Sequence, residues 1–222
     1  MRLGVISDIH GNLPALESVD AAMPPVDAVI CAGDVVGYNP WPADCLEYVR
    51  KREVPTVRGN HDRAVAVDGG AHFNGMAKAG VAYARDQLNE DRLKWLESLP
   101  TERFLADGRI HMVHGHPDDP DRNTYPRSFS PSMLAEGVDL LVVGHTHIQA
   151  TKEFSEGVVL NPGSVGQPRD GEPTAAFAVV ELDESGVDVE LKRVKYDIDR
   201  VIEAVDEAGL PKRIGTRLRS GS

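Results

Sequence analysis

Five short apolar segments of the chain each end on residues that can bind a metal ion. Runs such as Leu3–Ile6 are typical of buried β-strands. The residues that follow the five segments are Asp8-Ile9-His10, Gly33-Asp34, Gly59-Asn60-His61-Asp62, His114 and Gly144-His145-Thr146-His147. Packing gives no reason for carboxylate, amide and imidazole groups to follow every one of these strands. The pattern therefore favours one shared site.

The order of apolar patterns predicts an α/β sandwich. Strands and helices alternate up to about residue 100, whereas strands predominate between residues 110 and 196. We expect helices over residues 13–23, from Asn39-Pro40 onward, and over 76–87, 89–99 and 201–208, with strands over 27–33, 54–57, 110–113, 138–143, 152–154, 158–160, 174–182 and 187–196. This pattern suits stacked sheets with helices on their outer faces. In such folds, ligands gather at the carboxyl ends of the strands.

Length and composition indicate one ordinary globular domain. The 222 residues suit a single domain over residues 1–212, followed by a polar, flexible tail over residues 213–222. The net charge of −11 argues against binding to long duplex nucleic acid. The longest uninterrupted apolar run is Ala175–Val180, far short of the ~18 residues that a membrane span requires. We therefore expect a cytoplasmic protein without a membrane partner. The sequence does not indicate an oligomeric state.

The residue types at the strand ends predict a site for two metal ions. Alternation along an extended segment would bring Asp8 and His10, or His145 and His147, to the same side. The Asp34 carboxylate has two oxygens and could bridge two ions. Mixed imidazole and carboxylate ligands suit manganese, iron, cobalt, nickel or zinc. Two such ions would hold a hydroxide and polarise a phosphoryl oxygen, so we expect in-line hydrolysis of a phosphoester.

These five blocks, in this order and with these flanking glycines, resemble the signature of the calcineurin-like metallophosphoesterase superfamily. The resemblance extends over residues 3–181. Asp8-Ile-His-Gly-Asn12, Gly33-Asp-Val-Val-Gly37 and Asn161-Pro-Gly-Ser-Val165 are most similar to the small prokaryotic YfcE-like and diadenosine-tetraphosphatase-like phosphodiesterases. The resemblance implies a four-layer α/β/β/α sandwich.

The resemblance also implies a role for each matching residue. One metal would be held by Asp8, His10, Asp34 and His147, and the second by Asp34, Asn60, His114 and His145. Among the possible transition metals, manganese is our first expectation. His61 would contact the phosphate and protonate the leaving oxygen, with Asp62 as its orienting partner.

Three further residues are candidates for substrate binding. Arg58 could meet a phosphate through its planar guanidinium or could be a surface charge. Asn12 could donate to a phosphoryl oxygen or could cap a helix. His116 could face the site or lie in a loop. Tyr38 and Arg169 are weaker candidates, suggested by a stacking side chain and by proximity in sequence to Asn161–Val165.

We expect a phosphodiesterase that acts on a small or nucleotide-like phosphoester. A diadenosine polyphosphate hydrolase or a phosphoprotein phosphatase is the alternative within catalysis. A non-catalytic interaction module of the same fold is the alternative outside it, although that reading predicts missing ligands and none is missing.

Overall fold

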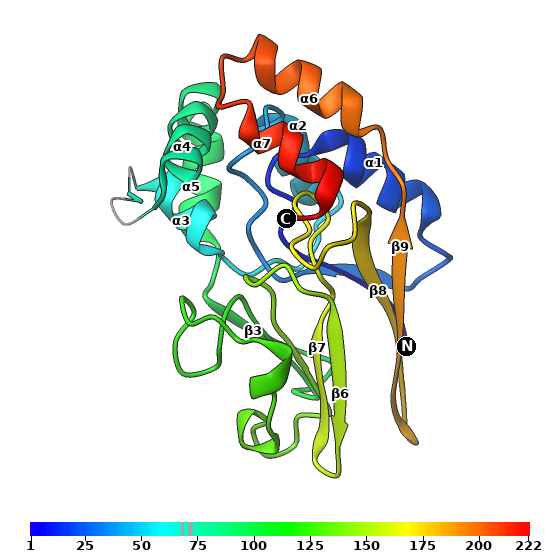
Figure 1. The fold of residues 1–222 in the computed structure, drawn as a ribbon. Helices are drawn as coiled ribbons and strands as arrows, with labels where there is room; N and C mark the ends of the chain where they lie inside the picture. Colours follow the sequence, from blue (N-terminus) through cyan, green and yellow to red (C-terminus); the bar gives the residue numbers. More distant parts are fainter. Residues whose placement is uncertain (68, 71–72) are drawn as a thin grey trace.

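The computed structural model describes residues 1–67, 69–70 and 73–222, and places them around two β-sheets (Figure 1). The first sheet has the strand order β2-β1-β8-β9 and the second β3-β4-β5-β7-β6. The strands of the first sheet are β1 (Arg2–Ile6), β2 (Ala28–Cys31), β8 (Ala175–Asp183) and β9 (Gly186–Val194). Those of the second are β3 (Glu102–Leu105), β4 (Ile110–Val113), β5 (Leu140–Val142), β6 (Ala150–Phe154) and β7 (Gly157–Asn161).

The helices lie mainly on the outer side of the first sheet. They are α1 (Leu13–Ala22), α2 (Pro42–Lys51), α3 (Asn60–Ala66), α4 (Gly75–Gln87), α5 (Glu90–Ser98), α6 (Ile198–Glu207) and α7 (Arg213–Thr216). Three short 3₁₀ helices complete the described elements: η1 (Pro126–Ser128), η2 (Pro131–Met133) and η3 (Arg217–Ser220). None of the helices in the described ranges is long and apolar enough to span a bilayer.

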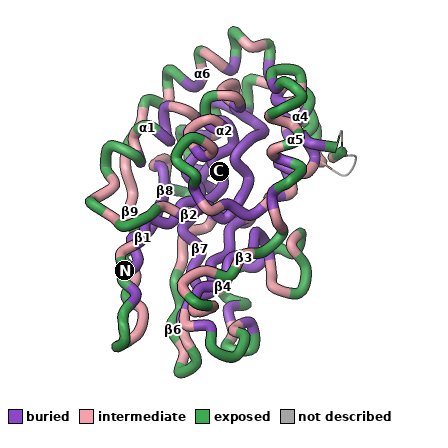
Figure 2. Tube along the Cα trace, turned by 180° about the vertical axis from the view of Figure 1, so that it is seen from behind, coloured by how far each residue is buried: buried purple, intermediate pink, exposed green. Residues whose placement is uncertain are grey.

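The two sheets pack face to face, as the alternation of β1 shows. Leu3 and Val5 point toward the second sheet and meet Ile110, Met112 and Leu140 in one buried cluster. Ile6 belongs to a separate cluster with the helices. Period-two alternation thus gives β1 two buried faces, which explains its continuous apolar sequence. Figure 2 shows the buried backbone concentrated in these central layers.

The predicted two-sheet α/β architecture is confirmed, but its fourth layer is thin. The outer face of the second sheet, with Leu141, Val143 and Val159, is covered by Phe129 and Met133 from the segment that holds η1 and η2. This segment includes the Pro-rich region between residues 116 and 131 and continues through η2, and its prolines limit regular α-helix. Single helical turns cover the small apolar face instead.

Two local predictions were wrong. The second helix begins at Pro42 rather than at Asn39-Pro40, because the Asn39 side chain donates to the His10 carbonyl instead of capping a helix. The segment 54–57 forms only a single bridge, between Thr56 and Cys31, and is not a strand.

The C-terminal segment also differs from the flexible tail that we expected. Residues 213–220 form α7 and η3, and the side chains of Ile214 and Leu218 are fully buried. These two apolar residues are four positions apart, so they lie on one helical face. They pack with Val201 and Val205 of α6, which orders the segment.

Candidate metal centre

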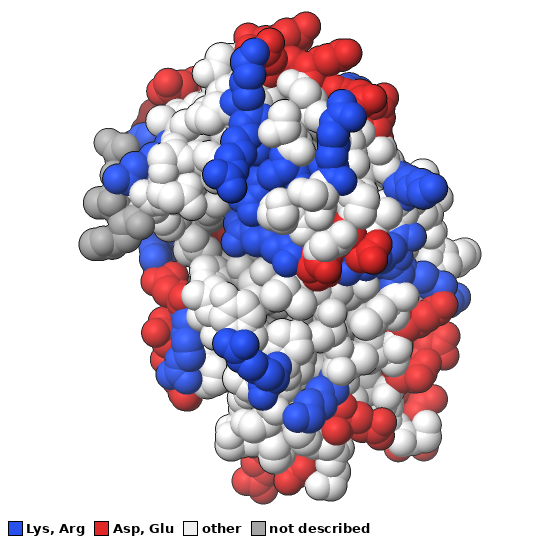
Figure 3. Space-filling model, in the orientation of Figure 1, with Lys and Arg blue, Asp and Glu red and all other residues white. Residues whose placement is uncertain are grey.

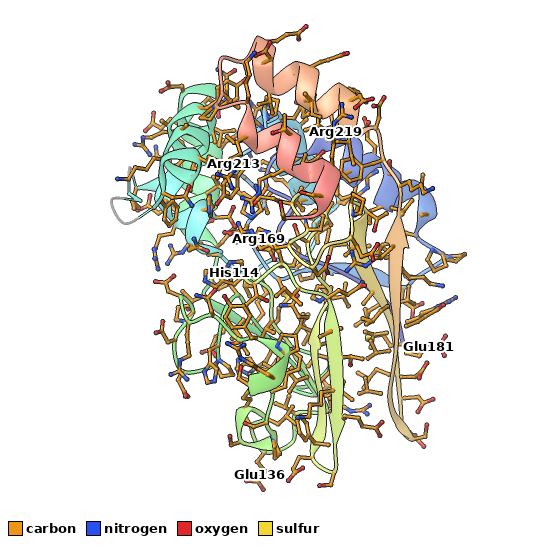
Figure 4. All side chains as sticks on the ribbon, in the orientation of Figure 1. His114, Glu136, Arg169, Glu181, Arg213 and Arg219 are labelled. Carbon is orange, nitrogen blue, oxygen red and sulfur yellow. The ribbon has the colours of Figure 1, made fainter. Side chains whose placement is uncertain are left out.

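Parallel strand pairing brings the five predicted segments to one edge of the two sheets. β1 pairs parallel with β2 in the first sheet, and β4 pairs parallel with β5 in the second. Asp8 and His10 follow β1, Asp34 follows β2, His114 follows β4, and His145 and His147 follow β5. Asn60 and His61 begin α3. Both sheets therefore contribute to one cluster, near the position of His114 in Figure 4.

Six residues of this cluster have left-handed backbone conformations. Asp8, His10, Asp34, Tyr38, His145 and His147 have φ between 50° and 67°. The prediction that an extended backbone aligns Asp8 with His10, and His145 with His147, was therefore wrong. Tight turns directly after the strands bring these side chains together instead. Asp and His tolerate the left-handed region better than most residues.

The first group of ligand atoms consists of Asp8, His10 and His147. These residues each offer an atom within 4.8 Å of the others, and all three are buried. The His10 Nδ1 lies 3.3 Å from the Val36 carbonyl, and the His147 Nδ1 lies 2.5 Å from the Gln167 carbonyl. Because a carbonyl only accepts, each Nδ1 carries the proton, and each Nε2 presents a lone pair when the ring is neutral. The two Nε2 atoms face one another at 3.1 Å.

The second group contains Asn60, His114 and His145. The His114 Nδ1 contacts the Ala32 carbonyl at 2.7 Å, which again directs a lone pair from Nε2 into the site. This Nε2 lies 3.3 Å from the His145 Nδ1 and 3.1 Å from the Asn60 Oδ1. The His145 Nδ1 is also 2.8 Å from the same Asn60 oxygen.

Asp34 lies between the two groups. Its Oδ2 is 3.6 Å from the His10 Nε2 and 3.3 Å from the His114 Nε2. Its Oδ1 accepts a hydrogen bond from the backbone N–H of His61 at 2.8 Å, which fixes the carboxylate. Gly59 leaves room for this arrangement, since a Cβ there would lie 2.0 Å from the same Oδ1. The Oδ2 atom of Asp34 therefore lies close to ring nitrogens of both groups.

This donor set fits a pair of divalent cations. Paired imidazole lone pairs repel one another unless a proton or a cation lies between them. Asp8 adds a buried Oδ1 that has no hydrogen-bond donor within the described part of the chain. The rings of His10, His114 and His147 are each oriented by a backbone carbonyl at Nδ1, as is usual for histidine ligands of metals. The site thus supplies a set of oriented imidazole, carboxylate and amide ligand atoms suited to a metal.

The protonation states agree with this fit for most of the ligands. Burial lowers the pKa of His10 well below its ordinary value, and burial together with the neighbouring His114 lowers the pKa of His145 to about 4. Burial would raise the pKa of Asp34, but the nearby His114 and His61 hold it well below its usual range. His114 is the exception, because Asp34 outweighs burial and raises its pKa to about 10. A bound cation would displace that proton.

His61 lies beside the two groups, and one of its ring nitrogens is within 4.8 Å of ligand atoms of His10 and Asp34. Its ring lies between Tyr38 and Phe73, with centroid distances of 4.7 Å and 4.6 Å. Burial lowers its pKa to about 4, and its Nδ1 has no partner among the described residues.

Asp62 does not orient His61 as we predicted. Its two carboxylate oxygens accept hydrogen bonds from the backbone N–H groups of Val36 and Gly59, each at 3.1 Å. Burial and the neighbouring Asp34 raise its pKa to about 7. Asp62 therefore caps α3 and ties it to the loop after β2, while aromatic contacts hold the His61 ring.

A cavity of about 210 Å³ opens over these groups. Its lining includes five residues of the ligand cluster and its surroundings, Asp34, Asn60, His61, His145 and His147, together with five others, Tyr38, Phe73, Asn74, Ala77 and Arg169. The cavity is small, polar and directly connected to the ligand cluster.

Comparison with known proteins assigns the chain to a family. Residues 1–185 match the calcineurin-like phosphoesterase superfamily domain, which is most of the 222-residue chain. The chain belongs to the calcineurin-like phosphoesterase superfamily. The predicted family is thus confirmed, and the protein is a phosphoester hydrolase.

Three relatives illustrate the range of similarity. An uncharacterized protein of Methanocaldococcus jannaschii is 32% identical over 239 residues, covering 99% of this chain and 98% of that protein. Phosphodiesterase YfcE of Escherichia coli K12 is 26% identical over 186 residues, covering 82% of this chain and 89% of YfcE. The crystal structure of a metallophosphoesterase from Sphaerobacter thermophilus has 34% identity and a TM-score of 0.82, with complete coverage of both chains.

The phosphoesterase does not place the three predicted substrate contacts in its cavity. Asn12 is fully buried, caps α1 through the Ala15 N–H and donates to the Gly166 carbonyl. Arg58 donates to the Glu97 carbonyl at 2.9 Å. His116 accepts from the Asp118 N–H in the loop after β4. Neither Arg58 nor His116 lines the cavity.

Sequence signals were weak for the residues that line the cavity of this phosphoesterase away from the ligand cluster. Tyr38 and Arg169 were minor candidates, and both line the cavity. Phe73 and Asn74 were not predicted, because neither belongs to a strand-end block. Phe73 would have been difficult to identify from sequence, since a single aromatic residue in a loop is equally typical of packing.

Proposed function

We propose that this phosphoesterase is a phosphodiesterase that uses two divalent metal ions to hydrolyse a small or nucleotide-like phosphoester. The main support is the position of Asp34, with one oxygen 3.6 Å and 3.3 Å from ring nitrogens of two separate histidine groups. A carboxylate shared in this way is suited to bridging two cations. Asp8, His10 and His147 would complete one ligand set, and Asn60, His114 and His145 the other.

Divalent ions held by these residues would supply Lewis-acid stabilisation of the phosphoryl group and an activated water at neutral pH. The chain itself provides the rest of the site. Backbone hydrogen bonds to Asp34 and carbonyl contacts to the histidines hold the ligands in place before substrate arrives. Such preorganisation avoids a reorganisation cost during the reaction.

His61 is the proposed proton donor to the leaving oxygen; because burial lowers its pKa to about 4, it would hold this proton only when a negatively charged phosphate lies against the ring. It lines the cavity, and Tyr38 and Phe73 restrict its ring to one orientation. A general acid must lie within reach of the reacting oxygen, and His61 is next to the Asp34 ligand. The small cavity volume of about 210 Å³ supports a small-molecule substrate rather than a long duplex.

Manganese is the proposed native metal, because the ligands are imidazole, carboxylate and amide without thiolate. The cytoplasmic location remains a prediction.

The test is hydrolysis of bis(p-nitrophenyl) phosphate and of cyclic nucleotides by metal-free protein reconstituted separately with Mn²⁺, Ni²⁺ and Co²⁺. We expect turnover of at least one of these diesters, and two equivalents of bound metal per chain by elemental analysis. Absence of turnover with every metal, or saturation at one equivalent, would contradict the dinuclear proposal. A p-nitrophenyl phosphate control separates diester from monoester hydrolysis.

A further inference from the structure

The C-terminal segment forms part of the surroundings of the cavity, outside the residues that match the family domain. α7 and η3 bury Ile214 and Leu218 in a cluster that includes Tyr38 and Ala77, which line the cavity. The family match ends at residue 185. This segment lies beyond the family model but within the full-length alignments to the Methanocaldococcus jannaschii and Sphaerobacter thermophilus proteins, and it packs beside the cavity.

The end of the segment is fixed to the loop that carries Arg169. The Gly171 N–H donates to the Gly221 carbonyl at 2.9 Å. Gly221 has a left-handed φ of 59°, and a Cβ at this position would lie 2.6 Å from the Glu172 backbone. This close approach holds η3 against the loop.

Three arginines come together through this packing. Arg169 lines the cavity, and its guanidinium contacts the Tyr38 hydroxyl at 3.3 Å. Arg217 is half-buried, and burial together with the positive charges of Arg169 and Arg213 lowers its pKa. Arg213 and Arg217 are four residues apart, so they share one side of the segment. Figure 4 shows Arg169 and Arg213 on the same side of the fold as His114.

Arg169 donates to the Gln167 side chain at 2.7 Å, and Arg217 donates to the Ser222 oxygen. None of the three guanidinium groups has an Asp or Glu partner within 4.0 Å in residues 1–67, 69–70 and 73–222. Their neighbours in the segment do: Arg219 pairs with Asp199 at 2.8 Å, and Lys212 pairs with Asp206 at 3.1 Å. Figure 3 shows basic side chains gathered near the centre of this face, with a few acidic side chains beside them and the others toward the edges. In a chain of net charge −11, three neighbouring arginines without Asp or Glu partners are a local attractor for a small anion.

We propose that Arg169, Arg213 and Arg217 form an anion-binding site, the arginine subsite, that binds a second phosphate of the substrate. The inferred substrate class is a phosphoester with at least one phosphate beyond the one that is cleaved, such as a nucleoside polyphosphate ester. Guanidinium groups bind phosphate oxygens through two parallel hydrogen bonds, and Arg169 links the subsite directly to the cavity. This inference rests on the proposed function.

Three substrates separate phosphate recognition from nucleoside recognition. Bis(p-nitrophenyl) phosphate has one phosphate and no nucleoside, the p-nitrophenyl ester of thymidine 5′-monophosphate has one phosphate and a nucleoside, and diadenosine tetraphosphate has both a nucleoside and additional phosphates. With metal-loaded full-length protein, we expect kcat/KM for diadenosine tetraphosphate to exceed that for the thymidine ester by about 10-fold or more.

The variants R213Q and R217Q remove one charge each from the subsite. We expect each to lower the ratio of kcat/KM for diadenosine tetraphosphate to that for the thymidine ester by about 10-fold, mainly through KM. R219Q is the matched control, since it removes the same charge from the same segment but from a residue paired with Asp199. Because Arg217 is half-buried, R217Q could lose activity through misfolding, and R217K, which keeps the positive charge, tests for this. Arg213 is exposed, so R213Q should not disturb the fold.

The arginine subsite would be overturned if the ratio of kcat/KM for diadenosine tetraphosphate to that for the thymidine ester were unchanged in R213Q and R217Q. It would also be overturned if this ratio fell equally in R219Q. Calorimetric titration with inorganic pyrophosphate decides the question even without turnover. We expect the Kd for pyrophosphate to rise about 10-fold in R213Q but not in R219Q. Equal pyrophosphate affinities of the wild-type and R213Q proteins would reject the subsite. Absence of turnover with all three substrates would instead contradict the proposed function.

Discussion

Backbone strain in the described part of the chain is concentrated at the residues of the candidate metal centre. Six of the nine non-glycine residues with left-handed φ belong to the site. Each such conformation costs on the order of 1–3 kcal/mol unless the side chain tolerates it. The surrounding hydrogen bonds compensate for this cost, as in Asp8, whose Oδ2 accepts from the Ser7 hydroxyl and from the His145 N–H. Strain of this kind is typical of functional sites.

Replacing Asp34 by Asn should weaken both metal sites together. The change removes the charge that faces His10 on one side and His114 on the other. Elemental analysis after gel filtration should give less than half of the wild-type metal content, with loss from both sites. Asp118→Asn, in an exposed loop, is the charge-matched control. Full occupancy in Asp34→Asn would show that this carboxylate does not bridge.

Replacing His61 by Ala should slow turnover while leaving metal content unchanged. Loss of a general acid typically costs about 10² to 10⁴ in rate. Steady-state kinetics with bis(p-nitrophenyl) phosphate measures the effect. A useful comparison is His111→Gln, because His111 contacts Glu102 on the second sheet, outside the cavity. A rate within about twofold of wild type in His61→Ala would remove His61 from the mechanism.

The sequence predicted which residues come together in the site, but not the backbone conformation of the turns that bring them together. Strand-end positions of Asp8, Asp34, His114 and His147 followed from apolar runs and parallel pairing. The turns could not be predicted from alternation, because the chain leaves the extended conformation as soon as each strand ends. Asn12 shows a second limit of prediction from sequence. An Asn at this position suits a helix cap and a phosphate donor equally well, and only its contact with the Gly166 carbonyl in the structure distinguishes the two roles.

At the scale of helices and strands, side-chain caps and buried faces explain where the elements lie. Asn74, Asn89 and Asp197 cap α4, α5 and α6 through backbone N–H groups. Such caps are local signals and can be identified in the sequence. β3 and the C-terminal α7 were missed because their stability depends on partners distant in the chain. β3 alternates exposed and half-buried residues against β4, and α7 packs against α6.

Replacing Asn12 by Ala should destabilise the fold rather than abolish substrate binding. The change removes the cap of α1, worth about 1 kcal/mol, and leaves the buried Gly166 carbonyl without its donor. We expect the free energy of unfolding to fall by about 2 kcal/mol in urea titrations. Asn89→Ala removes a more exposed cap and should cost about 1 kcal/mol. An Asn12→Ala protein of wild-type stability but raised KM would favour the substrate-binding role.

Replacing Ile214 by Ala tests whether the C-terminal segment is ordered in solution. Ile214 is fully buried, so the truncation should lower the free energy of unfolding by about 2–4 kcal/mol. Urea denaturation provides the measurement, and the exposed substitution Thr216→Ala in the same helix provides the control. Equal stabilities of the Ile214→Ala and Thr216→Ala proteins would indicate a frayed tail.

At the scale of the whole molecule, the candidate metal centre lies where the two sheets meet. Asp8, His10 and Asp34 come from loops of the first sheet, whereas His114, His145 and His147 come from loops of the second. When no cation is bound, like groups in this site repel one another, as the His10 and His147 ring nitrogens at 3.1 Å do. The bound state should therefore be more stable than the metal-free state.

Removal of the metal with a chelator should lower the melting temperature. A metal present at about 100 times its Kd stabilises the native state by about 2.7 kcal/mol. For a chain of this size, that corresponds to a shift of about 5–10 °C. Differential scanning calorimetry before and after chelation measures the shift, and Mn²⁺ added back should restore it. An Asp34→Asn protein should show a much smaller response, and identical melting temperatures with and without metal would contradict metal binding at the meeting point of the sheets.

The division of ligands between the two sheets has a mechanical consequence. Leu3 and Val5 of one sheet and Met112 and Val142 of the other form the apolar interior directly behind the ligand loops. A displacement by a single residue along a strand, about 3.3 Å, would be comparable to the spacing of the ligand atoms themselves. The apolar interior therefore sets the relative position of the two sheets and so of the ligands that each sheet carries. A larger or smaller side chain there should lower the rate of hydrolysis without changing any residue that contacts the metals or the substrate.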